Sequence, residues 1–503
     1  MRIYNNAPQT QIKTPNFRRP LDAPLTQGLA VLNTNPMLNA SLVDVFAMGL
    51  PRTIVEYRER NKYAGFEMAF REFTGTFIAC FSAGLFGQMI NKTMSKRLQP
   101  EVKVNENSWA SNNAIEVLNE INETDKNKSY SEKLFASLSG LNKNKEQEWK
   151  NVNWSKIEWY DKDSWNNINW ENKEYEGIHK RMKSEKSIVE TFDRLITDKN
   201  ISKKDAKHLQ EILAERVINV LGAENNVTVK SGDKSITSTV HNVLRDAIDM
   251  GKNVFSTNEA EKIISKLKKL NKVKTLGALA LSVVLALTNQ AINRYITQKR
   301  TGSKEFVGNM NYESHLSEGK QVDKKKNLNF NKVLASAGFV AMLAKVMNIK
   351  NTKDFFKKLE FTGPTTSGNA IKTVYGALIL GRFFASKDNT ELRETVVRDY
   401  LGFLNWLVLG GFVAKGVGNL LDRDRKDLFN TSKEGKGVKH WLNDVSLKTH
   451  SEIVAQGGKD VKKNLRKLNI AHISGLAYSA LMLGILLPKL NIAMTKHNQK
   501  GVV

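Results

Sequence analysis

Four basic side chains interrupt stretches of this 503-residue chain that are otherwise apolar. They are Lys345, Lys372, Arg382 and Lys415. An ionisable residue inside an apolar helix is a functional candidate by default, and four cations that face one cavity could attract an anion. Alternatively, each cation lies at a helix end, where its long stem reaches toward water. The sequence therefore leaves open an anion-handling transporter or channel.

Motifs of the common catalytic sites are missing from the sequence. It has no phosphate-binding loop, no dinucleotide-binding glycine motif, no H-E-x-x-H and no G-x-S-x-G. The eight histidines are dispersed without metal-ligand spacing, and the single cysteine, Cys80, excludes an internal disulfide framework. We predict no catalytic residue, no metal site and no cofactor, and nothing in the sequence points to an enzyme.

Five of the eight tryptophans lie close together, in a segment where the unit W-x-x-[VI]-x-W occurs three times. They are Trp149, Trp154, Trp159, Trp165 and Trp170. In an extended segment, an aliphatic residue and the tryptophan two positions later point to the same side. Such a cluster could anchor the chain at a membrane interface or bind a partner. The alternative is a small aromatic core within a partly ordered linker.

Residues 186–270 are predicted to form a soluble pair of helix–loop–helix segments. Each contains a hydrophobic residue and a serine followed by an acidic residue and an alanine. This outline resembles a degenerate EF-hand pair, but Ile196 and Met250 stand where calcium would need oxygen ligands. We therefore predict that Ser202 and Ser256 cap the helices that follow them.

The longest apolar stretches predict membrane spans. Residues 73–90, 275–293, 400–421 and 470–487 have the length of about 18 residues or more that a helix needs to cross a hydrocarbon core. Residues 333–344 and 373–381 are shorter, which is more typical of buried core helices or re-entrant segments.

Small residues recur at four-residue spacing within three of these stretches. They are Gly75, Ala79, Ala83 and Gly87 in the first, Ala278, Ser282 and Ala286 in the second, and Gly475, Ser479, Ala480 and Gly484 in the last. This spacing lets helix backbones approach closely in lipid. We predict that these residues mark helix–helix contacts, although a buried helix pair in a soluble protein can show the same spacing.

The chain is strongly basic, with a formal net charge of +26. Lysines and arginines gather at the ends of the apolar stretches, which favours a membrane with anionic lipid headgroups as a partner. Nucleic acid is the other polyanion that this charge could serve. The stretches 73–90 and 275–293 both favour a cytoplasmic N-terminal end, yet consecutive spans must alternate. Either one of them is not a span, or the region between them contains another element.

We predict an all-α fold, that of a multi-helix membrane-associated protein whose apolar helices pack through small residues. The proline-rich residues 1–40 are predicted to be a flexible leader, and residues 41–98 an amphipathic segment followed by the first span. Residues 99–185 are predicted to be a polar linker, largely helical or partly disordered. Residues 271–497 form the C-terminal apolar bundle, with three to five spans. No cleavable signal peptide is recognisable.

Three classes of function remain open. The favoured class is a multi-pass membrane protein with a structural or interaction role, in which the region 101–270 contacts a protein partner. The second class is the anion-handling transporter or channel. The third is a soluble, basic helical protein that binds a polyanion and is cytoplasmic or peripheral to the membrane.

Overall fold

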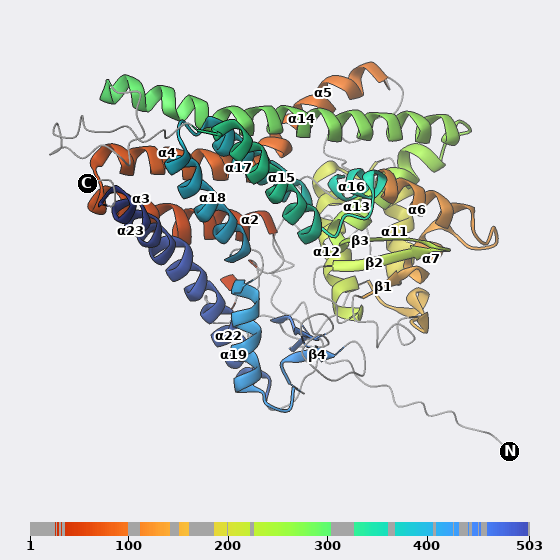
Figure 1. Ribbon diagram of the computed structural model, residues 1–503. Coiled ribbons are helices and arrows are strands. Elements are labelled where there is room, and N and C mark those ends of the chain that lie inside the picture. The colour runs from red at the N-terminus through yellow and green to blue at the C-terminus, as the bar shows by residue number, and fades with distance from the viewer. Residues whose placement is uncertain are drawn as a thin grey trace. The chain divides into compact units, whose positions relative to one another are not determined.

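The computed structural model describes most of the chain between residues 26 and 500. Outside the description lie residues 1–25, 27, 30–31, 33–35, 99–110, 141–149, 160–185, 199, 222–225, 303–325, 361–367, 406–408, 426, 432–440, 442–444, 451, 454–459 and 501–503. Helices predominate in the described part, which confirms the all-α class (Figure 1).

The chain forms two compact units. Unit 1 comprises Met1–Thr34, Asn113–Ile264 and Asp422–Asn469. Unit 2 comprises Asn35–Asn112, Ser265–Leu421 and Ile470–Val503. Each unit is therefore assembled from segments that are far apart in the sequence.

The core of unit 1 is built mainly from amphipathic helices. They are α6 (Asn112–Glu123), α7 (Tyr130–Ala136), α11 (Ile188–Thr197), α12 (Lys203–Leu221) and α13 (Val240–Met250), with the π-helical turn η5 (Gly251–Phe255) and the 3-10 turn η4 (Trp154–Lys156). A capping box of Ser187 and Glu190 starts α11, which buries Phe192 on its inner face. The ring of Phe192 meets Phe135 of α7 edge-on, with 5.4 Å between the ring centroids.

Unit 1 also contains a β-hairpin that the sequence analysis did not predict. The strands are β2 (Asn226–Ser231) and β3 (Lys234–Thr239), and β1 (Leu138–Ser139) pairs with β2 to complete an antiparallel sheet. Because successive side chains of a strand point to opposite faces of the sheet, Val227, Val229 and Ile236 lie in the core. The two-residue turn requires Gly232, whose φ is +53°.

The segment of unit 1 after residue 422 contains the strand pair β4 (Phe429–Thr431) and β5 (Val445–Leu447). His450 follows β5 and is 1% exposed. Its Nε2 lies 2.8 Å from Asn469 Oδ1, and the Asn469 amide donates to Thr26 Oγ1 at 2.8 Å. This chain of hydrogen bonds ties three distant parts of the sequence together within unit 1.

One of the two predicted serine caps is confirmed. Ser202 precedes α12, and its Oγ accepts a hydrogen bond from the backbone N–H of Asp205 at 3.1 Å. The prediction for Ser256 is wrong, because this residue follows η5 rather than starting a helix. Its hydroxyl donates back to the Lys252 carbonyl oxygen at 2.7 Å, so it closes the preceding turn.

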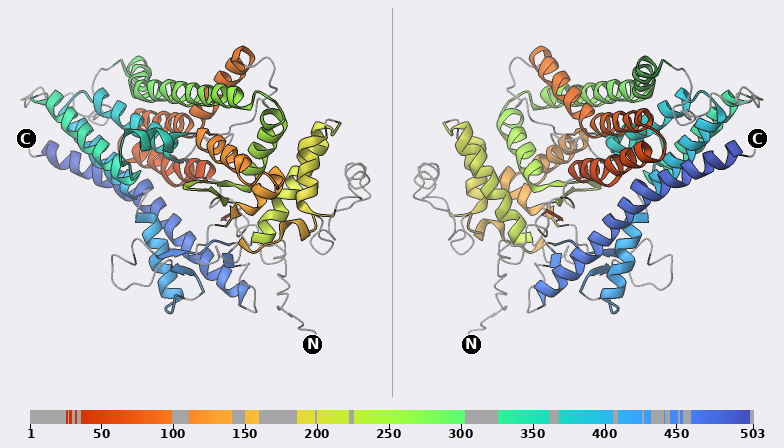
Figure 2. Two further views of the ribbon diagram at one scale, coloured as in Figure 1. Left: turned by 90° about the vertical axis from the view of Figure 1, so that its right-hand side faces the viewer. Right: turned by 90° about the vertical axis from the view of Figure 1, so that its left-hand side faces the viewer.

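Unit 2 consists of long helices, several of which contain π-helical turns. The first is α2 (Pro36–Leu42), η1 (Val43–Gly49) and α3 (Leu50–Glu59), and the second is α4 (Lys62–Phe77), η2 (Ile78–Ser82) and α5 (Ala83–Leu98). The others are α14 (Ala260–Thr301), α15 (Leu328–Val346), α16 (Thr352–Leu359), α17 (Gly368–Ala385), α18 (Asn389–Leu404) and α19 (Gly410–Leu421). Finally α22 (Val461–Leu481), η8 (Met482–Leu486) and α23 (Leu487–Lys500) run on as one helix (Figure 2).

The predicted leader 1–40 is too long at its C-terminal end. Most of it lies outside the described residues, but a helix begins at Pro36. Pro36 stands at the first turn of α2, whereas Pro51 follows the π-helical turn η1 inside the same long helix. A first-turn proline loses no hydrogen bond at a free helix start and presets the helical φ. Pro36 belongs to the predicted flexible leader 1–40, and Pro51 lies in the segment 41–98 that was predicted to be amphipathic.

Four helices of the described residues are long and apolar enough to cross a membrane. They are Met37–Glu59, Lys62–Met94, Ala260–Thr301 and Val461–Met494. The predicted stretches 73–90, 275–293 and 470–487 lie within three of them. The stretch 400–421 is divided between α18 and α19, with residues 406–408 outside the description. Of the two shorter stretches, 333–344 belongs to α15 and 373–381 to α17.

Helix α17 forms the apolar centre of unit 2. Its residues Val374, Leu378 and Phe383 are buried and pack in one cluster with residues of α14 and α15. Phe339 of α15 meets the ring of Phe383 edge-on, at 6.1 Å between centroids. The cluster holds α15, α17 and α18 together around the polar site described below.

Candidate functional site: a buried charge network

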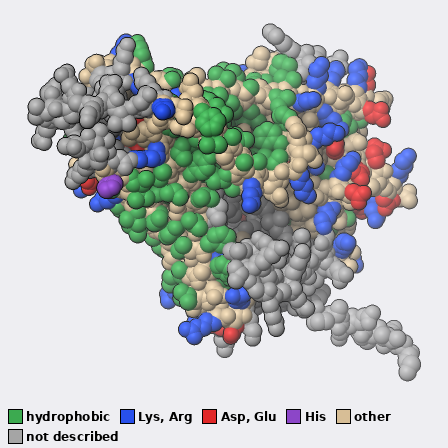
Figure 3. Space-filling model, viewed as in Figure 1, with side chains coloured by type: hydrophobic (Ala, Val, Ile, Leu, Met, Phe, Trp, Pro, Cys, Tyr) green, Lys and Arg blue, Asp and Glu red, His purple; other side chains and the backbone are tan. Residues whose placement is uncertain are grey.

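The interior of unit 2 contains charged side chains, whereas many large hydrophobic side chains lie on its surface. Every exposed large hydrophobic side chain among the described residues belongs to unit 2, and the described residues of unit 1 expose none. Phe46 (63% exposed), Val284 (60%) and Phe330 (68%) illustrate this surface. In the space-filling view, hydrophobic side chains cover a broad area over α15 and α22 (Figure 3).

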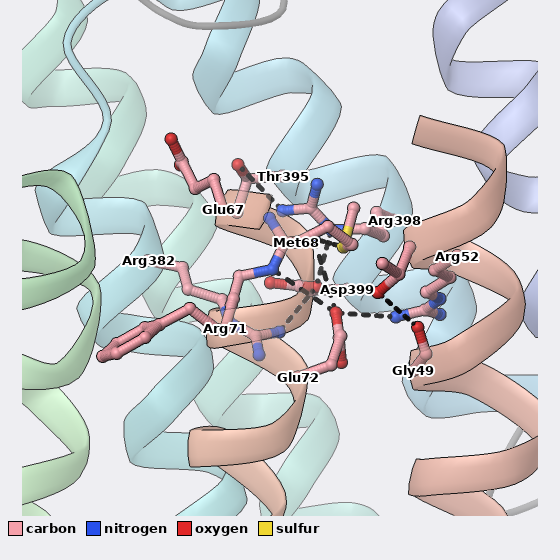
Figure 4. A network of polar contacts seen from close by, with 12 residues as sticks. Gly49, Arg52, Glu67, Met68, Arg71, Glu72, Arg382, Thr395, Arg398 and Asp399 are labelled. Carbon is pink, nitrogen blue, oxygen red and sulfur yellow. Dashed lines mark hydrogen bonds and ion pairs between the residues drawn. The ribbon is translucent and has the colours of Figure 1, made fainter. Parts of the chain in front are cut away.

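The centre of the network joins the hairpin of α3 and α4. Arg52 Nη1 and Arg71 Nη2 each lie 3.3 Å from Glu72 Oε1, and all three side chains are at most 7% exposed (Figure 4). Arg52 Nε donates to the Leu483 carbonyl oxygen of η8 at 2.7 Å, and Arg71 Nη2 contacts Met68 Sδ. One carboxylate thus holds two guanidinium groups, and one of these also fixes a third helix.

A second group of charges joins α17 to α18. Arg382 Nη1 lies 3.1 Å from Asp399 Oδ1, and Arg398 Nε lies 3.3 Å from the same oxygen. Arg398 Nη2 donates to Thr395 Oγ1 at 3.3 Å. Figure 4 shows Arg71, Glu72, Arg382 and Asp399 turned toward one another between the helices. The two groups therefore form one continuous charged interior.

Further pairs extend the network toward the helix ends. Arg60 bridges Glu56 at 3.3 Å and Glu394 at 2.7 Å, which connects the end of α3 to α18. Arg294 of α14 pairs with Glu391 of α18. The network thereby connects helices of both the N-terminal and the C-terminal half of the chain.

Polar side chains of α14 meet α4 in the same interior. Gln290 Nε2 donates to Glu67 Oε1 at 3.3 Å, and Asn293 Nδ2 donates to the Glu67 carbonyl oxygen at 3.0 Å. Asn289 Oδ1 accepts from Thr74 Oγ1 at 3.1 Å. These contacts fix the register of the two long helices against each other.

Asp44 is another buried carboxylate of this interior, and one of its oxygens lacks a partner among the described residues. It lies in η1 and is 2% exposed. Thr76 Oγ1 donates to its Oδ2 at a long 3.4 Å, and its Oδ1 has no hydrogen-bond partner among the described residues. The π-helical turns η1 and η8 lie against each other here, with Met48 and Leu483 in one cluster. Such turns often occur at functional sites in helices.

Chemically, this arrangement suits helix association rather than reaction. Buried ion pairs are costly to break because removing one partner leaves a charge in a low-dielectric environment. The described residues contain no group of three or more His, Cys, Asp and Glu side chains placed to hold a metal ion. The network therefore offers specific contacts between helices.

Of the four predicted intramembrane cations, Arg382 belongs to this network. Lys415 of α19 is also buried, Lys372 is half-buried, and Lys345 is exposed at the end of α15. Lys372 and Arg382 are ten positions apart on α17, a rise of about 15 Å. The structure therefore does not bring the four cations into one cluster.

The small residues predicted to mark helix contacts lie mostly on inward faces of unit 2. Ala79, Ala83, Ala278, Ser282 and Ala286 are fully buried, and Ser82 Oγ lies 2.8 Å from Ser282 Oγ. Gly75 faces Arg382 and Leu378, Gly87 is buried, and Ala480 is half-buried.

Two glycines of the last helix allow backbones to touch. A Cβ at Gly475 would lie 2.6 Å from the Gly410 carbonyl oxygen, and one at Gly484 would lie 2.6 Å from the Ala47 carbonyl oxygen. The neighbouring Ser479 is buried and faces Gly410. Only glycine permits these approaches without displacement of one backbone.

Two of the five predicted interaction tryptophans lie in the core of unit 1. Trp154 is 4% exposed and its ring centroid lies 5.3 Å from that of Phe135, and Trp159 is 5% exposed. Trp149, Trp165 and Trp170 lie outside the described residues. For the two described tryptophans, the geometry is that of an aromatic core.

The sequence analysis missed the charge network. Several of its acidic residues occur in α4 and α18, where Glu67 precedes Arg71 by four positions and Glu394 precedes Arg398 by four. This spacing puts both charges on one helix face. Charged pairs on one face of an otherwise apolar helix were the available signal, but their partners on other helices could not be read from the sequence.

Comparison with known proteins gave no relative. No protein-family description, no curated protein and no solved structure matches this chain.

Proposed function

We propose that this is a multi-pass membrane protein in which unit 2 lies in the bilayer and unit 1 in water, with a structural or interaction role. The observation that carries the proposal is the polarity of unit 2, which exposes many large hydrophobic side chains and buries ion pairs in its interior. In lipid, charged side chains face the bundle interior and pair with one another. The charges of unit 2 are arranged in that way.

A soluble polyanion-binding protein accounts poorly for this surface. Between 28% and 44% of the apolar window of each candidate span is buried, so more than half of each window is at least partly accessible. Soluble monomers rarely expose contiguous apolar patches larger than a few hundred Å². We therefore favour lipid as the solvent of these helices.

Chain connectivity sets the number of crossings in this proposal. Unit 1 contains Asn113–Ile264 and Asp422–Asn469, so both segments must occupy one aqueous compartment. The helices Met37–Glu59 and Lys62–Met94 leave that compartment and return to it. Helix α14 then takes the chain across the bilayer, away from the compartment of unit 1. The chain must return to that compartment before Asp422, so an odd number of crossings lies between α14 and Asp422.

Three shorter stretches supply that return, namely α15, α17 and the pair α18–α19. With Val461–Met494 as the last span, the chain makes seven crossings. Because Met37–Glu59 is the first span, the stretches 73–90 and 275–293 run in opposite directions through the bilayer, as consecutive spans must. The stretch 73–90 then begins on the side opposite unit 1, against the preference of the basic residues that flank it, whereas 275–293 begins on the side of unit 1.

The distribution of basic residues predicts which side unit 1 occupies. Lysines and arginines are dense where spans meet unit 1 segments, as at Lys262, Lys266, Lys268, Lys269 and Lys272 before the apolar half of α14 and at Lys462, Lys463, Arg466 and Lys467 at the start of α22. Such residues remain on the cytoplasmic side during insertion. We propose that unit 1 is cytoplasmic.

Single-cysteine labelling tests this topology. The chain has one cysteine, so Cys80→Ala gives a cysteine-free background. A membrane-impermeant maleimide should modify Lys126→Cys and Lys350→Cys from one side, and Arg58→Cys and Lys299→Cys from the other. Equal modification of all four from one side, or recovery of the protein in the soluble fraction, would contradict the proposal.

Anion handling is a second candidate, supported by buried guanidinium N–H groups. Arg52 Nη2, Arg382 Nε, and Nε and Nη1 of Arg294 have no hydrogen-bond partner among the described residues. Such donors suit water or a small anion. Chloride efflux from proteoliposomes tests this candidate. Flux above that of empty vesicles, reduced by Arg294→Gln, would support it, and the absence of flux would remove it.

A further inference from the structure

Helix α16 is a short helix held on unit 2 by one face. Asn351 Oδ1 accepts from the Asp354 backbone N–H at 2.9 Å and caps its start. Leu359 is 3% exposed and Phe355 packs on the same core. Lys358 Nζ lies 2.8 Å from Asp354 and donates to the Met347 carbonyl oxygen at 3.3 Å, which ties α16 to the end of α15.

The opposite face of α16 combines an exposed aromatic ring with two exposed lysines. Lys353, Phe356 and Lys357 are separated by three and four positions and therefore share one face. Phe356 is 46% exposed. Asp354, the acid within α16, is engaged by Lys358 and does not neutralise this face. A basic face with an outward aromatic ring is typical of helices that lie in a membrane interface.

We propose that the face formed by Lys353, Phe356 and Lys357 binds anionic phospholipid headgroups at the bilayer surface. The inference rests on the proposed function, since α15 and α17 must cross the bilayer for the loop between them to reach its surface. Phe356 then enters the boundary between headgroups and acyl chains, where aromatic rings are favoured. The two ammonium groups pair with lipid phosphates, which attract basic residues near the surface.

A fluorescent reporter beside this face tests the proposal in the full chain. Thr352 is exposed and leaves the three residues intact, so Thr352→Cys in the Cys80→Ala background carries an environment-sensitive dye. Val284→Cys is the reporter for a lipid-facing site and Lys126→Cys the reporter for water. Iodide quenching is measured in phosphatidylcholine nanodiscs with and without phosphatidylglycerol.

The proposal expects phosphatidylglycerol to reduce quenching of the Thr352→Cys dye several-fold. The double variant Lys353→Gln/Lys357→Gln should abolish this lipid dependence, and Phe356→Ser should weaken it. The matched control is Lys203→Gln/Lys207→Gln, which removes two exposed lysines at the same spacing on α12 and should change nothing.

The reporters separate two kinds of failure. If the Val284→Cys dye is protected but the Thr352→Cys dye is quenched like that of Lys126→Cys in both lipids, the headgroup site is refuted while the membrane proposal stands. If the Val284→Cys dye is also fully quenched, both are refuted. Protection of the Thr352→Cys dye by added RNA in phosphatidylcholine discs would assign this face to nucleic acid instead.

Discussion

Arg52 of α3 and Glu72 of α4 form an ion pair of 3.3 Å at which each side chain is no more than 3% exposed. The two helices are joined by the short turn at Arg60 and Asn61, so this pair closes a helical hairpin. The same guanidinium donates to the Leu483 carbonyl oxygen, which adds the last long helix. A single arginine therefore connects three of the four candidate spans.

Removal of one partner of this pair should destabilise unit 2 strongly. We expect Arg52→Met or Glu72→Met alone to cost about 3–5 kcal/mol, because the remaining charge stays buried without its partner. The double variant should recover much of this loss. The free energy of unfolding in detergent is measured for the wild type, the two single variants and the double variant, and this double-mutant cycle gives the interaction energy of Arg52 with Glu72. Additive losses would mean that the two residues do not act as a pair.

Backbone contact at Gly475 should make this position intolerant of even one methyl group. Gly475→Ala places a Cβ 2.6 Å from the Gly410 carbonyl oxygen, and we expect a loss of about 1–3 kcal/mol from the forced displacement. Gly411→Ala is the control, because nothing lies within 4 Å of a Cβ there. It should be neutral or stabilising, since alanine favours helix over glycine. Equal effects on thermal unfolding would refute the close contact.

A charge on the outward face of α14 should distinguish lipid from water. Val284 is 60% exposed and lies at the middle of the stretch 275–293. In lipid, Val284→Lys should cost about 2.5–3.5 kcal/mol of insertion free energy. In water, an exposed substitution of this kind changes stability by less than about 0.5 kcal/mol. Insertion efficiency in microsomes measures the difference, and Ala136→Lys on exposed unit 1 surface is the control.

Acidification should destabilise unit 1 through His450. Burial lowers the pKa of this imidazole below its usual 6.5, against the opposing effect of the hydrogen bond with Asn469. The unfolded state therefore binds more protons as the pH falls through 6.5 toward the lower folded-state pKa, and stability decreases in that window. We expect the unfolding midpoint to drop between about pH 7.5 and about pH 5.5, and to drop less in His450→Gln. An identical drop in the variant would assign the effect to other groups.

The long apolar helices were the part of the fold that the sequence predicted best. The stretches 73–90, 275–293 and 470–487 lie in long apolar helices because hydropathy over such a window is a local property. The helix Met37–Glu59 was missed because Asp44, Arg52 and Pro51 interrupt its apolar pattern. Asp44 and Arg52 are explained by partners on other helices, which are remote in the sequence.

The charge network depends on contacts between different helices, and the spacing of residues within one helix does not predict such contacts. Arg382 and Asp399 are both visible as charges in apolar surroundings, but their contact requires α17 and α18 to be packed together. The hairpin of β2 and β3 carried a local signal, a glycine turn at Gly232 between alternating β-branched residues. In that case the signal was present and was not used.

Extraction of native membranes at alkaline pH tests the central claim most directly. Carbonate opens vesicles and releases proteins held by charge, whereas proteins with spans stay in the pellet until detergent is added. Because unit 2 exposes its hydrophobic side chains and buries its ion pairs, we expect the protein to remain in the carbonate pellet and to dissolve in detergent. Release of folded protein into the carbonate supernatant would show that water, and not lipid, surrounds these helices.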